Sequence, residues 1–478
     1  MTFFALILLQ FSAIQSELLT DLKRFQVSDG IEHGTVAASI HRVSDNKPVL
    51  SFNEEKGVNS ASTLKLITTA TILNKLGSGF RYKTDLFYTG QISNNSLNGD
   101  LLIEGNGDPS FGSERGRNPY DQVLDDIYQT LNTLGIKEIN GNIIIDDETV
   151  FEFDAPDSWI WGDMGNYYGA LPHKFNINEN FFRVYFDPGN SVGANATVKN
   201  LIPFDPDWQI INLVKTGTSN SGDQVYIYSN PNSEVLILKG TVPLGRKNFP
   251  VKGSIPNPAK LFRVELLKML EKKGIEVADR HLTPLAADLP NSQTERHLIK
   301  RFLSQTLEEL SQDCNFSSIN LYADAFLHTT SLADTGFENF NDALKSLRSH
   351  WEERVSDLAG FNPKDGSGLS PSGYITASNM TNILSAMSKE VEYESFLNTI
   401  PVLGQEGSVR YKDRQKRTDG RVKAKSGSIE STRAFAGYFT DKQGTDYAFM
   451  VAVNRYEPDA SSKVRSFLDN FLVKMGTK

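Results

Sequence analysis

The segment 60–76 places the strongest constraint on the fold, because it is predicted to be a helix that begins with a serine and a lysine three residues apart. Its apolar residues recur near helical spacing: Leu64, Ile67, Ile72, Leu73 and Leu76. Gly77 and Gly79 then end the pattern. Side chains three apart share one face of a helix, so the Ser62 hydroxyl and the Lys65 amine are expected to lie together. A neutral lysine amine in that place can take the proton of the serine and leave an activated nucleophile.

A second Ser-x-x-Lys match, Ser44 to Lys47, is predicted to be a turn. It separates two short apolar runs, 36–40 and 48–52, and Ser-Asp-Asn between strand-like runs is typical of a hairpin loop. Ser62 instead lies in the first turn of a predicted helix, where free backbone N–H groups can stabilise an oxyanion. Ser62 is therefore the candidate nucleophile.

Length, charge and cysteine content limit the classes of protein to which the chain can belong. Its 478 residues are expected to form two or three domains. The 49 Lys and Arg against 58 Asp and Glu give a net charge of −9, which argues against a broad nucleic-acid-binding surface. Cys314 is the only cysteine, so no intramolecular disulfide can form, and it is expected to be a small buried residue. The seven histidines show no pair at helix-ligand spacing, so no metal site is expected.

Residues 1–16 form a short apolar stretch that is predicted to be a secretory signal peptide. A membrane-spanning helix needs about 20 apolar residues, which is longer than this stretch. No Lys or Arg precedes the apolar run, which leaves a buried N-terminal segment or a misassigned start as alternatives. No later segment looks transmembrane. The mature protein is therefore expected to be periplasmic and to have no stable membrane span.

The remaining elements are predicted from the periodicity of apolar residues and from turn residues. In order, they are short strands at 82–104 and 136–153, an amphipathic helix at 257–274, mainly helices from about 299 to 400, a β-hairpin at 432–453 and a closing helix from about 459 to 474. The strands at 36–52 and in the hairpin could pair in one antiparallel sheet. Such a sheet would bring the two ends of the chain together.

This order of elements predicts a catalytic domain that is interrupted by a long insertion. The fold class is mixed α/β (α+β), with an antiparallel sheet flanked by helices and a large β-rich insertion. The chain is predicted to divide into a signal peptide at 1–16, a first segment of the catalytic domain at 17–80, the insertion at 81–296 with a small all-β subdomain at about 187–255, and a second segment of the catalytic domain at 297–478.

Two further short motifs carry polar side chains that acyl transfer at a serine would need. Ser318 and Asn320, two apart at a helix start or loop, could place a hydroxyl and an amide on one rim of a cleft. The alternative is a helix N-cap, where both residue types are common. Lys425, Ser426 and Gly427 could present an ammonium, a hydroxyl and a closely approachable backbone to a carboxylate. The alternative is a basic strand end in a solvated region.

Ser-x-x-Lys, Ser-x-Asn and Lys-Ser-Gly, in this order, resemble the three motifs of penicillin-binding proteins and serine β-lactamases. Literal matches at 215–217 and 44–46 do not fit that order. The long interval between Ser62 and Ser318 is similar to the low-molecular-mass class C penicillin-binding proteins, the D-alanyl-D-alanine carboxypeptidase/endopeptidase family. Further segments resemble the same family: 105–110, 141–147, 159–170, 365–370 and 401–407. The resemblance implies a penicillin-binding-protein/β-lactamase-like catalytic domain.

The resemblance also implies a mechanism. Ser62 would attack the carbonyl between two D-amino acids of a peptidoglycan stem peptide or cross-link, with Lys65 as general base. Ser318 would pass the proton to the leaving nitrogen, and water would then hydrolyse the acyl-enzyme. Lys65 can act as a base only if burial and the cation of Lys425 lower its pKa toward neutrality. β-Lactam antibiotics would be inhibitors, and no metal or organic cofactor would be required.

The binding roles follow from the same resemblance. Asn320 would hold the peptide through its amide, while Lys425 and Ser426 would bind the terminal carboxylate. The backbone N–H groups of Ser62 and Ser428 would form the oxyanion hole.

Asp163 and Tyr168 lie in an aromatic segment of the insertion, together with Trp159, Trp161 and Tyr167. One interpretation is simple core packing. The other is a wall of the cleft, with Asp163 meeting a substrate ammonium such as that of a diamino acid in the stem peptide. Both remain open at this point.

Other functions are compatible with parts of the pattern. A serine β-lactamase has the same acylation chemistry but deacylates efficiently, and a related esterase would prefer small acyl esters. A non-catalytic cell-wall-binding protein is a third class, although three intact motifs argue against it. The oligomeric state does not follow from the sequence.

Overall fold

The computed structural model describes residues 15–146, 155–278, 295–332 and 339–477. Nearly all of the predicted signal peptide, 1–16, lies outside these residues. The chain divides into two compact units, and each is described by itself. One unit contains the chain up to Phe80, Pro156–Ser158 and the chain from Leu307 onward, and the other contains Arg81–Ala155 and Trp159–Thr306.

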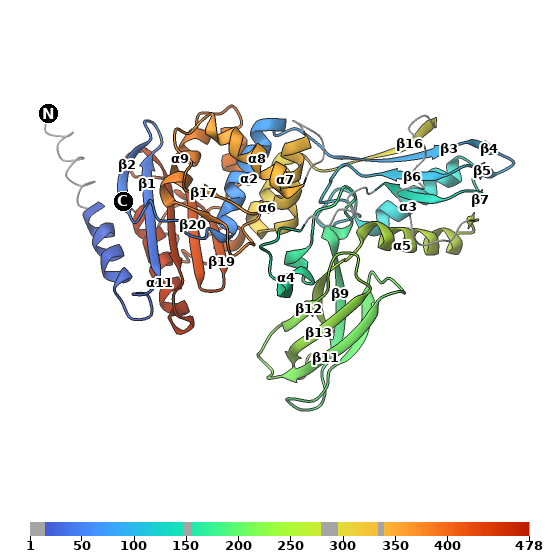
Figure 1. Ribbon diagram of the computed structural model, residues 1–478, viewed down its shortest axis with the longest axis horizontal. Coiled ribbons are helices and arrows are strands. Elements are labelled where there is room, and N and C mark those ends of the chain that lie inside the picture. The colour runs from blue at the N-terminus through green and yellow to red at the C-terminus, as the bar shows by residue number, and fades with distance from the viewer. Residues whose placement is uncertain (1–14, 147–154, 279–294, 333–338, 478) are drawn as a thin grey trace. The chain divides into compact units, whose positions relative to one another are not determined.

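A five-stranded antiparallel sheet forms the centre of the first unit, with the strand order β19-β20-β21-β1-β2 (Figure 1). The strands are β1 (Thr35–Arg42), β2 (Lys47–Phe52), β19 (Val422–Ile429), β20 (Thr432–Thr440) and β21 (Asp446–Asn454). β1 pairs with β21 from Thr35, opposite Asn454, to Arg42, opposite Tyr447. The predicted pairing of these distant segments is confirmed, and Ser44 lies in the turn between β1 and β2, as expected.

Helices cover both faces of this sheet (Figure 1). An N-terminal helix (residues 15–26) packs against α11 (Ser461–Gly476), where the rings of Phe25 and Phe467 stack 3.8 Å apart. The remaining helices of the unit are α2 (Lys65–Leu76), α6 (Leu307–Ser317), α7 (Asn320–Leu332), α8 (Phe340–Glu352), α9 (Ala377–Met387) and α10 (Tyr393–Asn398). Because helices lie on both sides, β21 is buried along almost its whole length, as strands covered on both faces are.

The second unit is built mainly from short strands around an apolar core (Figure 1). One sheet has the order β16-β3-β6-β8, with β16 (Arg296–Leu303), β3 (Lys83–Thr89), β6 (Leu101–Glu104) and β8 (Ile143–Asp146). A small sheet β15-β7-β5-β4 joins β15 (Glu276–Val277), β7 (Glu138–Ile139), β5 (Ser96–Asn98) and β4 (Gln91–Ser93). The helices α3 (Tyr120–Thr133) and α5 (Pro258–Lys272) accompany these sheets. The predicted helix at 257–274 is confirmed: the Asn257 side chain caps its start, and Gly274 follows its end with a φ of 81°.

Two three-stranded sheets lie in the region predicted to be a small all-β subdomain at about 187–255. Their orders are β10-β9-β14 and β11-β13-β12. The strands are β9 (Phe181–Asp187), β10 (Thr197–Ile202), β11 (Gln209–Gly217), β12 (Gln224–Tyr228), β13 (Val235–Pro243) and β14 (Phe249–Ser254). The literal Lys-Thr-Gly match at 215–217 is the end of β11, in the second unit.

The start of the helical region differs from the expectation. Residues 296–303 form the strand β16, which pairs antiparallel with β3, and the chain returns to the first unit only at Leu307. The predicted boundary between 296 and 297 therefore falls at the beginning of a strand of the second unit. The partner of β16 lies more than 200 residues earlier in the chain, so the local sequence carries no sign of this pairing.

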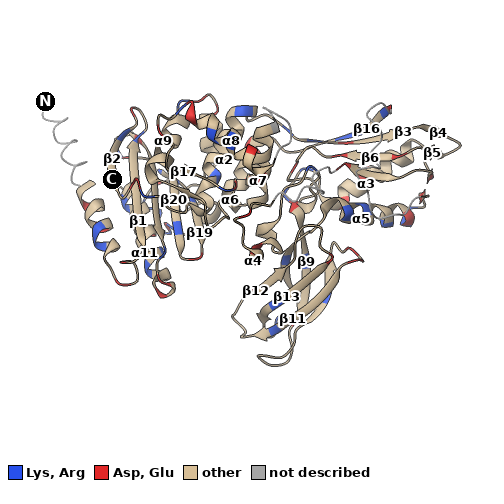
Figure 2. Ribbon diagram, viewed as in Figure 1, with Lys and Arg blue, Asp and Glu red and all other residues tan. Residues whose placement is uncertain are grey.

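Charge is mixed in both units: Figure 2 shows Lys and Arg interspersed with Asp and Glu along the helices and strands. Among the described residues, no helix has the length and apolar character that crossing a bilayer requires.

Candidate active site

The sequence predicted that Ser62 lies in the first turn of an α-helix. In the structure it lies in a short 3-10 helix that precedes the α-helix. The 3-10 helix covers Ala61–Leu64, and α2 begins at Lys65. Ala61 has a φ of 44°, a left-handed conformation that is costly for a residue with a Cβ. The Asn59 side chain stabilises this turn by accepting a hydrogen bond from the Ala61 N–H at 2.7 Å. Such strain is typical of active-site loops, and here it directly precedes the half-buried Ser62.

The Lys65 amine is the centre of the first cluster of candidate residues. Its Nζ lies 3.0 Å from Ser62 Oγ, and it donates to Asn320 Oδ1 at 2.7 Å and to the Ser367 carbonyl oxygen at 2.7 Å. The lysine side chain is fully buried. The structure thus brings together Ser62, Lys65 and Asn320, three of the residues that the sequence singled out.

The Lys425 amine is the centre of the second cluster. From β19 it donates to Ser318 Oγ at 2.8 Å and to the Ser426 carbonyl oxygen at 2.9 Å. Ser318 precedes α7 and has a φ of 57°, so it too is a non-glycine residue in the left-handed region. Ser428 lies exposed near the end of β19. The alternative interpretation of Lys425 as part of a solvated charged surface is wrong, since its side chain is fully buried.

Burial shifts the pKa values of both lysines in the same direction. It lowers the pKa of Lys65 below its usual 10.5, although Cys314, Asp324 and Asp365 each act against that shift. Burial lowers the pKa of Lys425 well below the same value, and repulsion from Lys65 adds to the effect. The repulsion also shows that the two clusters act on each other electrostatically.

Gly427 allows β19 to lie directly against the Ser62 turn. A Cβ at this position would meet the Ser60 carbonyl oxygen at 2.5 Å and the Ser62 nitrogen at 3.0 Å. Both are backbone atoms, so no side-chain movement can relieve the contact. The absence of a side chain at 427 is therefore a condition for the packing of the strand against the candidate nucleophile.

Replacing Gly427 by alanine is expected to lower the rate of acylation by a fluorescent penicillin about 10- to 100-fold, because displacement of a reacting group by about 1 Å commonly has an effect of this size. Gly79→Ala is the matched control, since a Cβ at position 79 meets no atom within 4 Å. Acylation rates and melting temperatures of the two variants check the prediction. Equal rates in Gly427→Ala and the wild type would contradict it.

Three further residues at this site were not found from the sequence. Ser408, in the 3-10 helix Gly407–Val409, shares a 2.7 Å hydrogen bond with the hydroxyl of Ser426. Ser367 contributes only its carbonyl oxygen, which no side-chain pattern can reveal. Asp324, on α7, is buried close enough to act on Lys65. The two glycines of the segment 365–370 were the one available signal for a close backbone approach.

Cys314 is buried, as expected, and burial raises the pKa of its thiol to about 12. A thiol of this kind is not a nucleophile near neutral pH.

Asp163 and Tyr168 belong to the second unit and interact with each other. Asp163 is in the short helix α4 (Trp161–Met164), and Tyr168 is in the 3-10 helix Tyr167–Gly169. The Tyr168 hydroxyl hydrogen-bonds to the Asp163 carboxylate and lowers its pKa, but burial has the larger effect and raises it. Trp161 and Tyr167 are 57% and 51% exposed, so not all of this aromatic segment is core.

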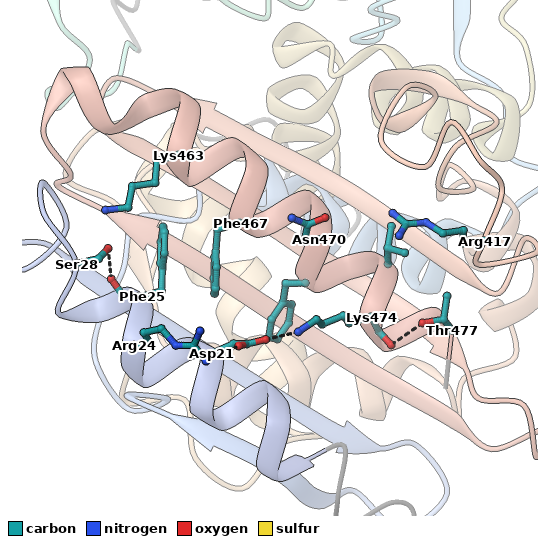
Figure 3. A pocket seen from close by; sticks show the side chains of 12 residues that line it. Asp21, Arg24, Phe25, Ser28, Arg417, Lys463, Phe467, Asn470, Lys474 and Thr477 are labelled. Atoms are coloured by element: carbon teal, nitrogen blue, oxygen red, sulfur yellow. Dashed lines mark hydrogen bonds and ion pairs between the residues drawn. The ribbon is translucent and has the colours of Figure 1, made fainter.

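One cavity of about 520 Å³ lies away from these clusters, between the N-terminal helix and α11 (Figure 3). Its walls include Phe25, Phe467 and Lys474, and it contains none of the candidate catalytic residues. Within the described ranges, no group of three or more His, Cys, Asp or Glu side chains is placed to hold a metal ion.

The arrangement of two buried lysines beside two serine hydroxyls agrees with the result of a comparison with protein families. The model of the D-Ala-D-Ala carboxypeptidase 3 (S13) family matches residues 19–475. The chain belongs to this family. The family is one of serine peptidases, so the resemblance found in the sequence motifs is confirmed.

Individual relatives cover nearly the whole chain. D-Alanyl-D-alanine carboxypeptidase DacB of Haemophilus influenzae is 25% identical over 462 residues, which are 92% of this chain and 89% of that protein. The penicillin-sensitive carboxypeptidase A of Dictyostelium discoideum is 22% identical over 474 residues, 92% of this chain and 86% of that protein.

A crystal structure of penicillin binding protein 4 (dacB) from Haemophilus influenzae has a TM-score of 0.78 to this chain, with 22% identity, and covers 97% of this chain and 99% of that one. A second structure of that protein, complexed with a β-lactam, has a TM-score of 0.73 with 20% identity and covers 96% and 98% of the two chains. Likeness at this identity concerns the fold, and it confirms the predicted mixed α/β class with a penicillin-binding-protein-like catalytic domain.

Proposed function

We propose that this chain is a serine-type D-alanyl-D-alanine carboxypeptidase/endopeptidase that cleaves peptidoglycan stem peptides and cross-links through an acyl-enzyme on Ser62. Membership of the S13 family and relatives named D-alanyl-D-alanine carboxypeptidase support the activity. The observation that carries the assignment of the nucleophile is the 3.0 Å contact between Lys65 Nζ and Ser62 Oγ, inside a cluster where the amine has two carbonyl acceptors.

The contacts of Lys65 explain how its amine can be a base. Asn320 Oδ1 and the Ser367 carbonyl oxygen can only accept hydrogen bonds, so each needs an N–H from Lys65. A neutral amine has two N–H groups and one lone pair. With both N–H groups engaged, the lone pair is left for the third neighbour, the Ser62 hydroxyl, which can then donate its proton.

The second cluster supplies the other steps. Ser318 would donate its hydroxyl proton to the leaving nitrogen and regain one from the Lys65 ammonium formed in the first step, while its Oγ accepts a hydrogen bond from Lys425 Nζ. Lys425 and Ser426 would bind the substrate carboxylate, with Ser408 orienting the Ser426 hydroxyl. The backbone N–H groups of Ser62 and Ser428 would stabilise the oxyanion.

β-Lactam binding is part of the same proposal, because a relative is named penicillin-sensitive and a structurally similar protein is described with a β-lactam. The direct test is to incubate the protein with penicillin, digest it and locate the acylated residue by mass spectrometry. The expected adduct is on Ser62, together with release of D-alanine from a D-Ala-D-Ala peptide. An adduct on any other residue would refute the assignment. The lifetime of the adduct separates a peptidase, for which hours are expected, from a β-lactamase.

The rate of acylation is expected to rise with pH through the pKa of Lys65, since only the neutral amine is a base. Burial lowers that pKa, so the midpoint of the rise should lie below 10.5, the value for an ordinary lysine. Acylation by a fluorescent penicillin, measured from pH 5 to 11, checks this. A midpoint at or above 10.5 would contradict a buried lysine base.

Asp163 is proposed to meet the ammonium of a diamino acid in the stem peptide. Its carboxylate already accepts a hydrogen bond from Tyr168, which would orient it. Asp163→Ala is expected to reduce the preference for peptides with a free side-chain amine over amidated ones about tenfold, the scale of a single charged hydrogen bond. Ratios of kcat/KM for the two peptides provide the measurement, with Asp157→Ala, an exposed residue, as control. An unchanged ratio in Asp163→Ala would favour the packing interpretation.

Export to the periplasm is proposed from the composition of residues 1–16. Deleting them should leave the protein in the cytoplasmic fraction of expressing cells. Periplasmic recovery of the shortened chain would refute the role of this segment.

A further inference from the structure

A buried loop, residues 365–370, holds the carbonyl group that orients Lys65. All of its residues except Leu369 are buried. It is pressed against two elements of the site: a Cβ on Gly366 would meet the Ala323 carbonyl oxygen of α7 at 2.6 Å, and one on Gly368 would meet the Ala61 carbonyl oxygen at 2.0 Å. The loop thus lies between α7 and the Ser62 turn, and small shifts in it would move the Ser367 carbonyl.

Asp324 anchors this loop to α7. It follows Asn320 by one helical turn, so both side chains lie on the same face of the helix. The Asp324 side chain is fully buried, and its Oδ1 accepts a 2.8 Å hydrogen bond from the Gly366 N–H, one residue before the Ser367 carbonyl. The carbonyl oxygen of Gly366, in the peptide group that joins it to Ser367, accepts a hydrogen bond from the Thr68 hydroxyl at 2.7 Å.

We propose that Asp324 is a positioning residue for acylation: it holds the Gly366–Ser367 backbone so that the Ser367 carbonyl occupies one N–H of Lys65 and leaves the amine lone pair for Ser62. This inference rests on the proposed function of Ser62 and Lys65. It assigns a role in the reaction to a buried carboxyl that acts through the backbone of the loop.

The position of the Ser367 carbonyl decides whether the Lys65 amine accepts a hydrogen bond from Ser62 or donates one to it. Among the described residues, Lys65 Nζ makes hydrogen-bond contacts to three groups, and two of these groups can only accept. If the Ser367 carbonyl moves away, an N–H can turn toward Ser62 Oγ, and the amine then donates to the nucleophile in place of accepting from it. The predicted result is slower acylation without weaker initial binding of the ligand.

The charge of Asp324 is not needed for this role. Burial and the neighbouring Asp365 raise its pKa well above the ordinary range, while Lys65, the Ser367 hydroxyl and the Gly366 N–H act in the opposite direction. Cys314 and Lys425 are also titratable groups near Lys65, and His328 lies one turn further along α7 with its ring against Phe340. Asp324 Oδ2 has no hydrogen-bond partner of normal geometry among the described residues. An asparagine keeps the Oδ1 acceptor and should therefore replace this aspartate.

The test compares Asp324→Asn, which keeps the acceptor, with Asp324→Leu and Asp324→Ala, which remove it. Stopped-flow acylation by a fluorescent penicillin over a range of concentrations separates the dissociation constant of the first complex from the acylation rate constant. Asp324→Asn is expected to stay within about threefold of the wild type. Asp324→Leu and Asp324→Ala are expected to lose about 10- to 100-fold in the acylation rate constant with an unchanged dissociation constant.

Asp413 supplies the matched control. It is also a buried carboxyl that accepts a backbone N–H bond, from Thr418 at 2.8 Å, but it is not among the groups that act on Lys65. Asp413→Leu should lower the melting temperature without a selective loss of acylation rate.

The outcomes are distinguishable. Equal acylation rate constants in Asp324→Leu, Asp324→Ala and the wild type would overturn the inference. So would a loss of acylation rate in Asp324→Asn or in Asp413→Leu as large as the loss in Asp324→Leu. Failure of the proposed function itself would appear differently, as a wild-type protein that forms no adduct on Ser62.

Discussion

Replacing Ser62 by alanine is expected to abolish both covalent labelling by a fluorescent penicillin and release of D-alanine from a D-Ala-D-Ala peptide. The labelling bond forms to the serine oxygen, so without Oγ no adduct can exist. Loss of a serine nucleophile lowers turnover about 10⁶-fold in a well-studied serine peptidase. The fold should be preserved, because Ser62 is half-buried and lies in a turn held by other groups.

Ser44→Ala is the control for this experiment. Ser44 starts the other Ser-x-x-Lys match, but it lies in the turn between β1 and β2. Its loss should change neither labelling nor hydrolysis. Labelling that persists in Ser62→Ala at the wild-type rate would show that another residue is the nucleophile.

Replacing Lys65 by arginine is expected to lower the acylation rate about 10²- to 10⁴-fold, the usual contribution of a general base. A guanidinium is positively charged and cannot lose its proton near neutral pH, so it cannot accept the proton of Ser62 as the neutral lysine amine can. It also cannot reproduce the fully buried packing of the lysine. The rate should therefore not recover when the pH is raised to 10.

Lys75→Arg is the control, because it tests whether replacing another lysine of α2 by arginine also lowers the acylation rate. Lys75 lies on the same helix, and its Nζ donates to Ser346 Oγ at 2.7 Å, away from the candidate nucleophile. The variant should acylate at the wild-type rate. A Lys65→Arg protein that regains activity at high pH, with a normal melting temperature in both variants, would exclude Lys65 as the base.

Several elements could be predicted because their signals are local. The amphipathic helix at 257–274 has a capping asparagine and a terminal glycine, and the structure places α5 there. The hairpin at 432–453 and the turn at Ser44 follow from alternating strands and turn residues. The same local patterns separated Ser62 from Ser44.

Other features could not be predicted because they depend on partners far away in the chain. β16 is a strand only through its pairing with β3. The 3-10 turn at Ser62 replaces a regular helix start, since Asn59 and the approach of Gly427 favour a strained Ala61. Ser408 contributes through its contact with Ser426, which lies 18 residues later in the chain.

The sequence by itself determined which side chains carry the chemistry: the order and spacing of Ser62, Lys65, Ser318, Asn320 and Lys425 already indicated an acyl-transfer site. Only the tertiary structure decided how the two lysines are used. Folding buries both amines, which lowers their pKa values, and it distributes their partners so that Lys65 faces Ser62 and Lys425 faces Ser318. The reason is that protonation and hydrogen-bond direction depend on desolvation and on acceptors from distant segments, such as the Ser367 carbonyl, which no local pattern encodes.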